Sequence, residues 1–175
     1  AVGARLLYPD GRVQHTGVIL GLGGVAGHGD AGRPADDPGP LYRAVASHRP
    51  SALTAACLMM RSSIFNRLNG FDATNLAIDF NDVDLCLRLH AAGYATLLLP
   101  TVELVHKESI SRGDNRDPAE SARFAKEVAY MRDTWGADLD HDPAYNPNLS
   151  IALGEAYSLA ESLRTEPVWK RASRS

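Results

Sequence analysis

The first twenty residues place two apolar stretches on either side of a polar turn. Residues 3–8 (GARLLY) and 12–20 (RVQHTGVIL) are rich in apolar side chains and flank Pro9-Asp10-Gly11. Proline fixes φ at the first turn position, and glycine tolerates the positive φ that follows. The pattern therefore predicts a β-hairpin.

Residues 21–50 keep neither a helical nor a strand period, because glycine, alanine and proline dominate them. A segment of this length without regular structure is uncommon inside a domain and is usually functional or mobile. We expect a mobile loop. Its two candidate explanations are a flap over a bound substrate and an insertion without a role.

Strand-like runs return in the middle of the chain. Residues 52–60 (ALTAACLMM) predict a buried strand by their length and apolarity, and residues 94–100 and 102–106 predict one or two more. Between them, Ser62 or Ser63 is expected to cap a short helix that Asn69-Gly70 ends.

Two further helices have clear start and stop signals. Asn81 is expected to cap the first, with Gly93 just past its end. The second begins at Asp117-Pro118, where Asp117 is the N-cap and proline lacks only an N–H that would be unpaired anyway. An apolar stripe follows at helical spacing and predicts the core-facing side: Phe124, Val128, Met131 and Trp135. We expect Gly136 to end this helix.

The order of these elements predicts an α/β fold, with a mixed sheet flanked by helices. Residues 1–150 form the expected domain, in which 138–150 is a polar, solvated loop, and 151–175 form a tail whose first part, to residue 163, favours a helix. Because the chain opens directly on strand-like sequence without Met, we expect it to be cut from a longer polypeptide.

Composition narrows the classes of function. The 175 residues carry 18 Lys and Arg against 21 Asp and Glu, a net charge of −3, which argues against a nucleic-acid partner. The apolar runs are shorter than the roughly 18 residues of a membrane span. Cys57 and Cys86 are the only cysteines, too few for a zinc ribbon or a disulfide framework, so we expect a cytoplasmic location.

Two motif-like patterns lack the context that their chemistry needs. Gly21-Leu22-Gly23-Gly24-Val25-Ala26 resembles a dinucleotide fingerprint, but glycines continue where the phosphate-binding helix would have to begin. Asp138, Asp140 and Asp142 alternate as in a calcium loop without its glycine and glutamate. Five histidines have no identifiable partner and are expected on the surface or in loops: His15, His28, His48, His90 and His141.

Two acids and one histidine remain as candidates. Asp82 and Asp84 fall in the first turn of a predicted helix, where the helix dipole stabilises a carboxylate by about 0.3–1 kcal/mol. His106 lies at the end of a predicted strand. Ligands often bind at the carboxyl ends of strands in α/β proteins. Taken singly, each of the three fits a structural role better than a catalytic or metal-binding one.

Several motifs in order resemble those of family 2 inverting glycosyltransferases. They are Gly70-Phe71-Asp72, Asn81 to Arg88 (NDVDLCLR), and His106-x-Glu108-Ser109 with Ser111-Arg112-Gly113. Residues 3–17 (GARLLYPDGRVQHTG) and 142–150 (DPAYNPNLS) resemble the family's bacterial cell-surface polysaccharide members. The resemblance spans residues 1–150 and implies the C-terminal, acceptor-side half of a GT-A-type domain.

The resemblance also implies roles for single residues. Asp82 matches the catalytic base, and His106 matches a ligand of Mn²⁺ or Mg²⁺. Arg112 is a candidate contact for the phosphates of the donor, and Asp84 and Thr54 are candidates for binding the acceptor. The implied partners are a nucleotide-diphosphate sugar, a glycan acceptor and an upstream nucleotide-binding half of the same polypeptide.

The chain departs from the family pattern in two places. No Asp-x-Asp follows a strand, although the family uses that motif to hold the metal, and Asn81 stands where relatives often carry an acid. We therefore expect the isolated chain to be inactive and the full-length protein to transfer sugar with inversion. The family often works at membranes, which leaves membrane association of the full-length protein open.

Two other functions remain as alternatives. The first is a non-catalytic carbohydrate-binding or regulatory module that keeps the acceptor-side fold. The second is a nucleotide-dependent oxidoreductase that uses the glycine-rich segment 21–26.

Overall fold

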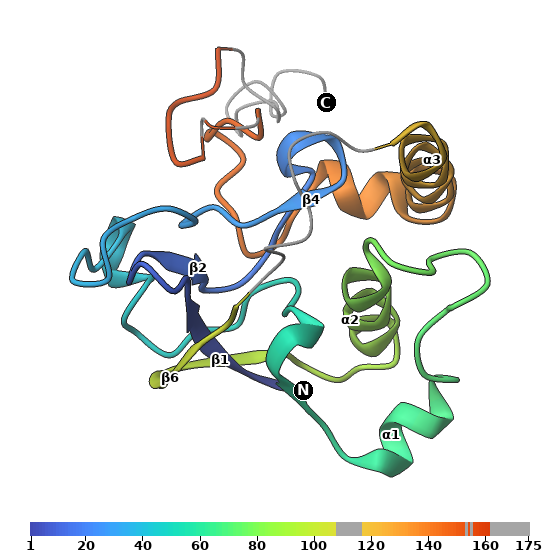
Figure 1. Cartoon of the computed structure of the whole chain (residues 1–175), viewed down its shortest axis with the longest axis horizontal. Helices are drawn as coiled ribbons and strands as arrows, with labels where there is room; N and C mark the ends of the chain where they lie inside the picture. The colour runs from blue at the N-terminus through green and yellow to red at the C-terminus, as the bar shows by residue number, and fades with distance from the viewer. Residues whose placement is uncertain (108–116, 153, 155, 162–175) are drawn as a thin grey trace, which may run out of the picture.

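A small mixed sheet forms the centre of the computed structural model, which describes residues 1–107, 117–152, 154 and 156–161. Strand β1 (Val2–Leu7) pairs antiparallel with β2 (Val13–His15) and β5 (Leu58–Met59), and parallel with β6 (Leu97–Val105). The helices lie beside this sheet (Figure 1), so the predicted α/β class with a mixed sheet is confirmed.

The predicted hairpin joins β1 and β2. Tyr8 N–H donates to the Arg12 carbonyl at 2.8 Å, and Gly11 adopts φ 83°, the left-handed conformation that the turn requires. The second arm is shorter than expected, because the chain leaves the sheet after β2. It continues as β3 (Ile19–Leu20), which pairs with β4 (Ala26–Gly27) in a separate two-stranded sheet.

The segment 21–50 contains more structure than its sequence predicts. Besides β4 it has two 3₁₀ turns, η1 (Leu22–Gly24) and η2 (Pro40–Tyr42). Buried Asp30 accepts hydrogen bonds from Thr16 Oγ1 at 2.5 Å and from Tyr157 Oη at 3.1 Å. These bonds tie the segment to distant parts of the chain, and its mobility stays a prediction.

The expected strand over residues 52–60 is wrong. Ala52 and Leu53 are buried, but the chain then turns outward through the 3₁₀ turn η3 (Ala55–Cys57), and only β5 pairs with the sheet. Thr54 begins the turn, since its Oγ1 accepts the N–H of Ala56 at 3.3 Å. Apolarity alone did not reveal this turn, because alanines are tolerated on an exposed turn.

The three predicted helices are present as α1 (Ser62–Arg67), α2 (Asn81–Ala91) and α3 (Pro118–Asp140). The N-caps predicted for α1 and α2, Ser62 or Ser63 and Asn81, are wrong. Arg61 precedes α1 without a side-chain cap, and Phe80 precedes α2 with φ 63°. Asp117 caps α3 as predicted, accepting the N–H of Glu120 at 2.8 Å.

The end of α3 and the segment after residue 150 differ from expectation. Helix α3 continues past Gly136 and ends at Asp140. Gly136 does not adopt the positive φ with which a glycine often ends a helix. Beyond it, none of the described residues between 151 and 161 is helical. Instead Leu149 and Leu159 form an isolated bridge, and Ser150 N–H donates to the Ser158 carbonyl at 2.8 Å. The described helices include none that is both long and apolar enough to cross a membrane.

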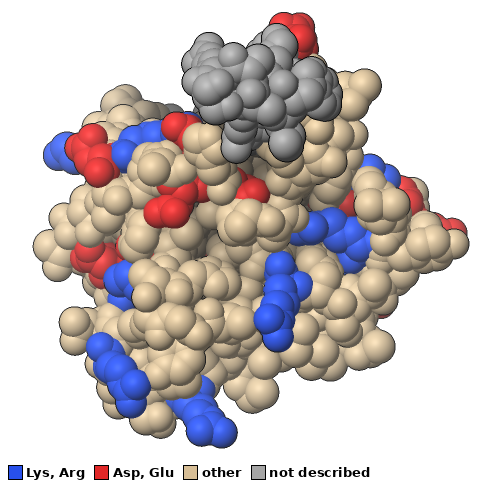
Figure 2. All heavy atoms as spheres, turned by 180° about the vertical axis from the view of Figure 1, so that it is seen from behind, with Lys and Arg blue, Asp and Glu red and all other residues tan. Residues whose placement is uncertain are grey.

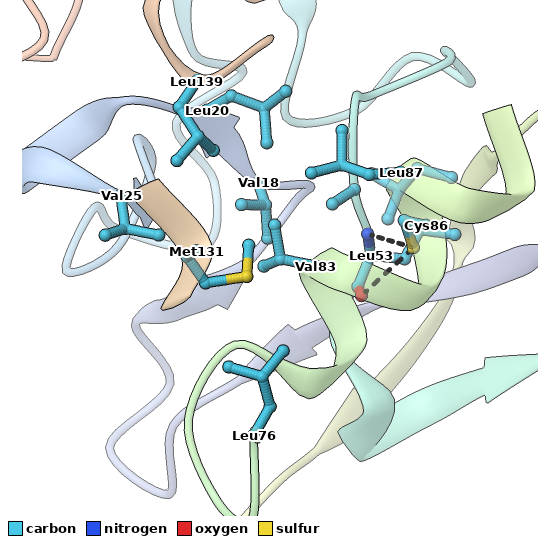
Figure 3. Packing of buried hydrophobic residues seen from close by; sticks show 12 residues of the cluster. Val18, Leu20, Val25, Leu53, Leu76, Val83, Cys86, Leu87, Met131 and Leu139 are labelled. Atoms are coloured by element: carbon cyan, nitrogen blue, oxygen red, sulfur yellow. Dashed lines mark hydrogen bonds between the residues drawn. The ribbon is translucent and has the colours of Figure 1, made fainter. Parts of the chain in front are cut away.

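The main core lies between α2, α3 and the strands (Figure 3). Val18 and Leu20 face it, whereas Ile19 between them packs in a second cluster with Leu22 and Tyr145, as the period of two in a strand requires. Cys86 is buried in the main core, and burial raises the pKa of its thiol to about 12. At neutral pH this thiol is therefore protonated and serves packing.

Candidate functional site

Asp82 lies at the start of α2, against the turn that precedes β5. Its Oδ2 accepts the N–H of Ala55 at 2.9 Å, and its Oδ1 accepts the N–H of Val83 at 2.8 Å. The side chain is half-buried and has no cationic side chain bonded to it among the described residues. Each oxygen keeps a lone pair, so the carboxylate is held in place and can still accept a proton.

Thr54 is brought to the same place. It precedes Ala55 in the turn that Asp82 binds, so two of the predicted site residues are neighbours. Thr54 N–H also approaches His15 Nε2 at 3.5 Å. The direct contacts of Thr54 stabilise the turn, and its role in binding an acceptor stays a prediction.

Asp84 has a different environment from Asp82. It is buried, its Oδ2 accepts from Arg88 Nε at 2.8 Å, and its Oδ1 accepts from Trp135 Nε1 at 2.9 Å. Arg88 in turn donates to the carbonyls of Leu68 and Gly70. Asp84 therefore links α2 to α3 and to the loop after α1, and its predicted acceptor contact is untested.

His106 follows the end of β6 and is positioned by Gln14. Its ring Nδ1 lies 2.9 Å from Gln14 Oε1, and the backbone N–H of His106 donates to the Leu7 carbonyl at 2.9 Å. Because a carbonyl oxygen can only accept, Nδ1 carries the proton and Nε2 keeps a free lone pair. That tautomer is the one a metal ligand needs.

Strand β2 lies between the two principal candidates. Gln14 contacts His106, and the next residue, His15, reaches the turn beside Asp82. Arg112, the candidate phosphate contact, lies outside the described residues. Within the described part of the chain, no three His, Cys, Asp or Glu residues are close enough together to hold a metal ion.

Helix α3 fixes the start of α2. Glu127 is buried, and its Oε2 accepts the N–H of Asp79 at 2.6 Å. Arg123 bridges the two acids, at 2.8 Å from Asp79 Oδ2 and 2.9 Å from Glu127 Oε1. Phe124 packs on Phe80 with ring centroids 5.6 Å apart, so the predicted apolar stripe contacts the segment that carries Asp82.

The expectation that the histidines lie free on the surface is wrong for His15. It is buried, and its Nδ1 is 3.0 Å from Nδ1 of exposed His28. Burial, with the nearby His28 second, holds the pKa of His15 well below its usual value. His90 also has a partner, since its Nε2 lies 3.0 Å from the Ser51 carbonyl. No local pattern indicated these pairs, because each joins residues far apart in sequence.

The structure also settles the two motif-like patterns. After Gly21 the chain enters a 3₁₀ turn and β4, so no α-helix begins where a dinucleotide would need one. Asp138 and Asp140 belong to the last turn of α3 and do not form a calcium loop. Asp142 is not solvated as expected: it is buried and accepts from Leu20 N–H at 2.7 Å and from Ser51 Oγ.

Charged side chains form no extended basic surface on the face shown in Figure 2. The Lys and Arg groups there are scattered over the face, and several of them lie beside Asp or Glu groups. With the net charge of −3, this distribution gives no support to a nucleic-acid partner.

Comparison with known proteins finds relatives of which one is uncharacterized, one is named for O-antigen biosynthesis and one for rhamnosyl transfer. The chain is 48% identical over 150 residues to an uncharacterized protein, y4gI, of Sinorhizobium fredii, and 35% identical over 153 residues to the O-antigen biosynthesis protein RfbC of Myxococcus xanthus. Over 74 residues it is 39% identical to an N-acetylglucosaminyl-diphospho-decaprenol L-rhamnosyltransferase of Mycobacterium tuberculosis. No family model and no solved structure matches the chain.

These matches cover much of the chain but little of the relatives. The first two include 86% of this chain, which spans only 16% and 12% of the length of those proteins. The third includes 42% of this chain and 23% of the relative. The chain is therefore related to one segment of much longer proteins, among them proteins named for O-antigen biosynthesis and sugar transfer.

Proposed function

We propose that this chain is the acceptor-side part of an inverting, metal-dependent glycosyltransferase that builds a bacterial surface polysaccharide. The partners are a nucleotide-diphosphate sugar and a glycan acceptor, and an upstream half of the same polypeptide holds the nucleotide. The proposal places the reaction in the cytoplasm, with the longer protein associated with the membrane. The named relatives support sugar transfer in general.

The observation that carries the proposal is the environment of Asp82. Backbone N–H groups at 2.9 and 2.8 Å hold its two oxygens, and no described cation is bonded to it. A carboxylate held in this way can orient an acceptor hydroxyl and accept its proton. As that oxygen bonds to the anomeric carbon, the bond to the diphosphate breaks and its electrons leave with the diphosphate. Attack from the opposite face inverts the anomeric carbon.

A divalent cation would be held in part by His106. Its free Nε2 fits one coordination position, and the hydrogen bond from Nδ1 to Gln14 at 2.9 Å fixes the ring. The remaining ligands have to come from outside the described residues, which assemble no cluster of three ligand side chains. When bound, Mn²⁺ or Mg²⁺ would neutralise charge on the departing diphosphate.

Replacement of Asp82 by Asn tests the proposed base in the full-length protein. The amide keeps the size of the carboxylate and one acceptor oxygen, loses one of the two hydrogen bonds from backbone N–H groups, and cannot take up the hydroxyl proton. Transfer from nucleotide-diphosphate sugars in the presence of Mn²⁺ should fall by about 10²–10⁴-fold. Affinity for the donor should change little, because Asp82 acts on the acceptor.

Asp133→Asn is the matched control, since Asp133 is an exposed acid on α3. It should transfer sugar at the rate of the unmodified protein. Urea unfolding of both variants separates loss of catalysis from loss of fold. Unchanged turnover in a correctly folded Asp82→Asn variant would refute the assignment of the base.

A further inference from the structure

Three cavities follow one another along α1, α2 and α3. The first, of about 370 Å³, is lined by residues that include Ala55 and Phe71. The second, of about 480 Å³, has both Phe71 and Trp135 in its wall. The third, of about 490 Å³, also has Trp135 in its wall. The first and second cavities therefore lie against the same residue, Phe71, and the second and third against Trp135, so the three are neighbours.

The series begins beside the proposed base. Ala55 lines the first cavity, and its N–H donates to Asp82 Oδ2 at 2.9 Å. The third cavity reaches His90, in the last turn of α2. Asp82 and His90 are eight residues apart, which corresponds to about 12 Å along a helix at 1.5 Å per residue. A ligand that touches both ends must be extended.

Aromatic side chains in the second cavity are held by hydrogen bonds at their polar ends. Trp135 Nε1 donates to Asp84 Oδ1 at 2.9 Å, and Tyr130 Oη donates to Asp72 Oδ2 at 2.9 Å. Phe71, which separates the first two cavities, is 39% exposed. Ordered rings of this kind offer flat apolar surfaces with little loss of side-chain freedom on binding.

The third cavity has two charged side chains without a protein partner. Arg49 and Asp138 line it and are exposed, and neither forms an ion pair or side-chain hydrogen bond with any described residue. The rest of the lining is mostly apolar and includes Leu20, Leu87 and Trp135. One positive and one negative group favour a ligand that carries many hydrogen-bonding groups and little net charge.

We propose that the three cavities form a track for the acceptor glycan, with its reacting sugar at Asp82 and earlier sugars passing Phe71 and Trp135 toward Arg49 and Asp138. A neutral oligosaccharide has the required chemistry, because its rings present apolar faces to aromatic side chains and hydroxyl groups to charged ones. The proposal rests on the proposed function and adds that several sugars of the acceptor are bound.

The test uses oligosaccharides of two, four and six sugars, prepared by partial hydrolysis of the producing cell's own surface polysaccharide. Their affinity for the full-length protein is measured by titration calorimetry. We expect affinity to rise with length, and the double variant Arg49→Ala, Asp138→Ala to weaken the six-sugar fragment about tenfold while leaving the two-sugar fragment unchanged. Neither residue supports the fold, so the variant should unfold like the unmodified protein.

Lys126→Ala with Asp133→Ala is the matched control, since it also removes one exposed charge of each sign from α3 without touching a cavity of the series. It should bind all fragments normally. Equal affinity for all lengths, or equal loss in both double variants, would overturn the track.

Transfer assays separate this proposal from the proposed function. Sugar transfer that Asp82→Asn abolishes, with no dependence of affinity on length, overturns the track and leaves the transferase in place. Length-dependent binding sensitive to Arg49 and Asp138, in a protein that transfers no sugar, supports the track and refutes the transferase, leaving a carbohydrate-binding module.

Discussion

Asp82 and Asp84 lie two positions apart in the first turn of α2 and have different environments. Successive helical residues are rotated by about 100°, so Asp82 and Asp84 point to different sides of the helix. Asp82 meets the Ala55 turn and stays half-open, whereas Asp84 is buried against Arg88 and Trp135. The sequence motif Asp-x-Asp does not distinguish the two residues. Their environments do: Asp82 is the proposed base, and Asp84 links α2 to α3.

The proposed role of His106 as a metal ligand can be tested by replacing this single residue. His106→Ala in the full-length protein removes the free Nε2 that we propose as a metal ligand. The affinity for Mn²⁺ in the presence of a nucleoside diphosphate, measured by titration calorimetry, should fall at least tenfold.

His141→Ala is the control, because His141 is exposed and its ring has no hydrogen-bond partner among the described residues other than the Ala137 carbonyl, at 3.3 Å. It should bind Mn²⁺ like the unmodified protein. If His106→Ala does the same, the proposed ligand is wrong.

Besides the hydrophobic core, buried polar contacts join several elements near their ends. Glu127 and Arg123 hold α3 to the segment before α2, and Asp142 holds the segment after α3 to β3 and to Ser51. Each contact replaces water around a buried charged or backbone group, so losing one partner leaves the other unsatisfied. We therefore expect the carboxylates of Glu127 and Asp142 to contribute to stability beyond the hydrophobic core.

Asp142→Asn tests this dependence. Asp142 accepts the N–H groups of Leu20 and Ala144 at 2.7 Å each, and the amide would turn a donor toward one of the groups that donate to it. The free energy of unfolding in urea should fall by about 2–3 kcal/mol. Exposed Asp133→Asn should change it by less than about 0.5 kcal/mol. A similarly small change at Asp142 would show that these bonds contribute little.

At the scale of the whole molecule, two histidines connect the glycine-rich segment to the sheet. His15 on β2 is buried and accepts Thr54 N–H at Nε2, so its Nδ1–H donates to exposed His28 in the segment 21–50. Burial disfavours the charged imidazolium and lowers the pKa of His15, so the folded chain favours the neutral ring. The free energy of unfolding therefore depends on pH through His15, although this residue is buried.

The linkage has a definite sign. Burial and the neighbouring His28 and His48 lower the pKa of His15 well below 6.5, so the unfolded chain binds more protons than the folded one as the pH falls below about 6.5. The free energy of unfolding should fall with decreasing pH, by up to about 1.4 kcal/mol per unit. Urea titrations between pH 7.5 and 4.5 measure this slope.

His15→Gln should flatten the slope, because glutamine does not titrate. His141→Gln, at an exposed position, should keep it. Part of the slope will remain in both variants, since burial also lowers the pKa of His48. A His15→Gln variant with the full slope would assign the pH dependence to other groups.

Local signals predicted the elements better than their ends. The hairpin at Pro9-Asp10-Gly11, the helix start at Asp117 and the acidic first turn of α2 depend on neighbouring residues, and all three are present. The strand expected over 52–60 is wrong, and the helix expected from 151 is absent from the described residues up to 161, because tertiary contacts override weak local preference.

Short-range patterns were enough to predict the α/β class, the position of Asp82 in the first turn of a helix and the position of His106 at the end of a strand. They could not predict that Thr54 lies beside Asp82, that Gln14 orients His106, or that Asp84 is buried. They also could not predict that the cavities lined by Ala55 and by Asp138 both neighbour the one lined by Phe71 and Trp135. These relations join residues tens of positions apart, and packing of the whole chain, which no local pattern encodes, sets the distances between them.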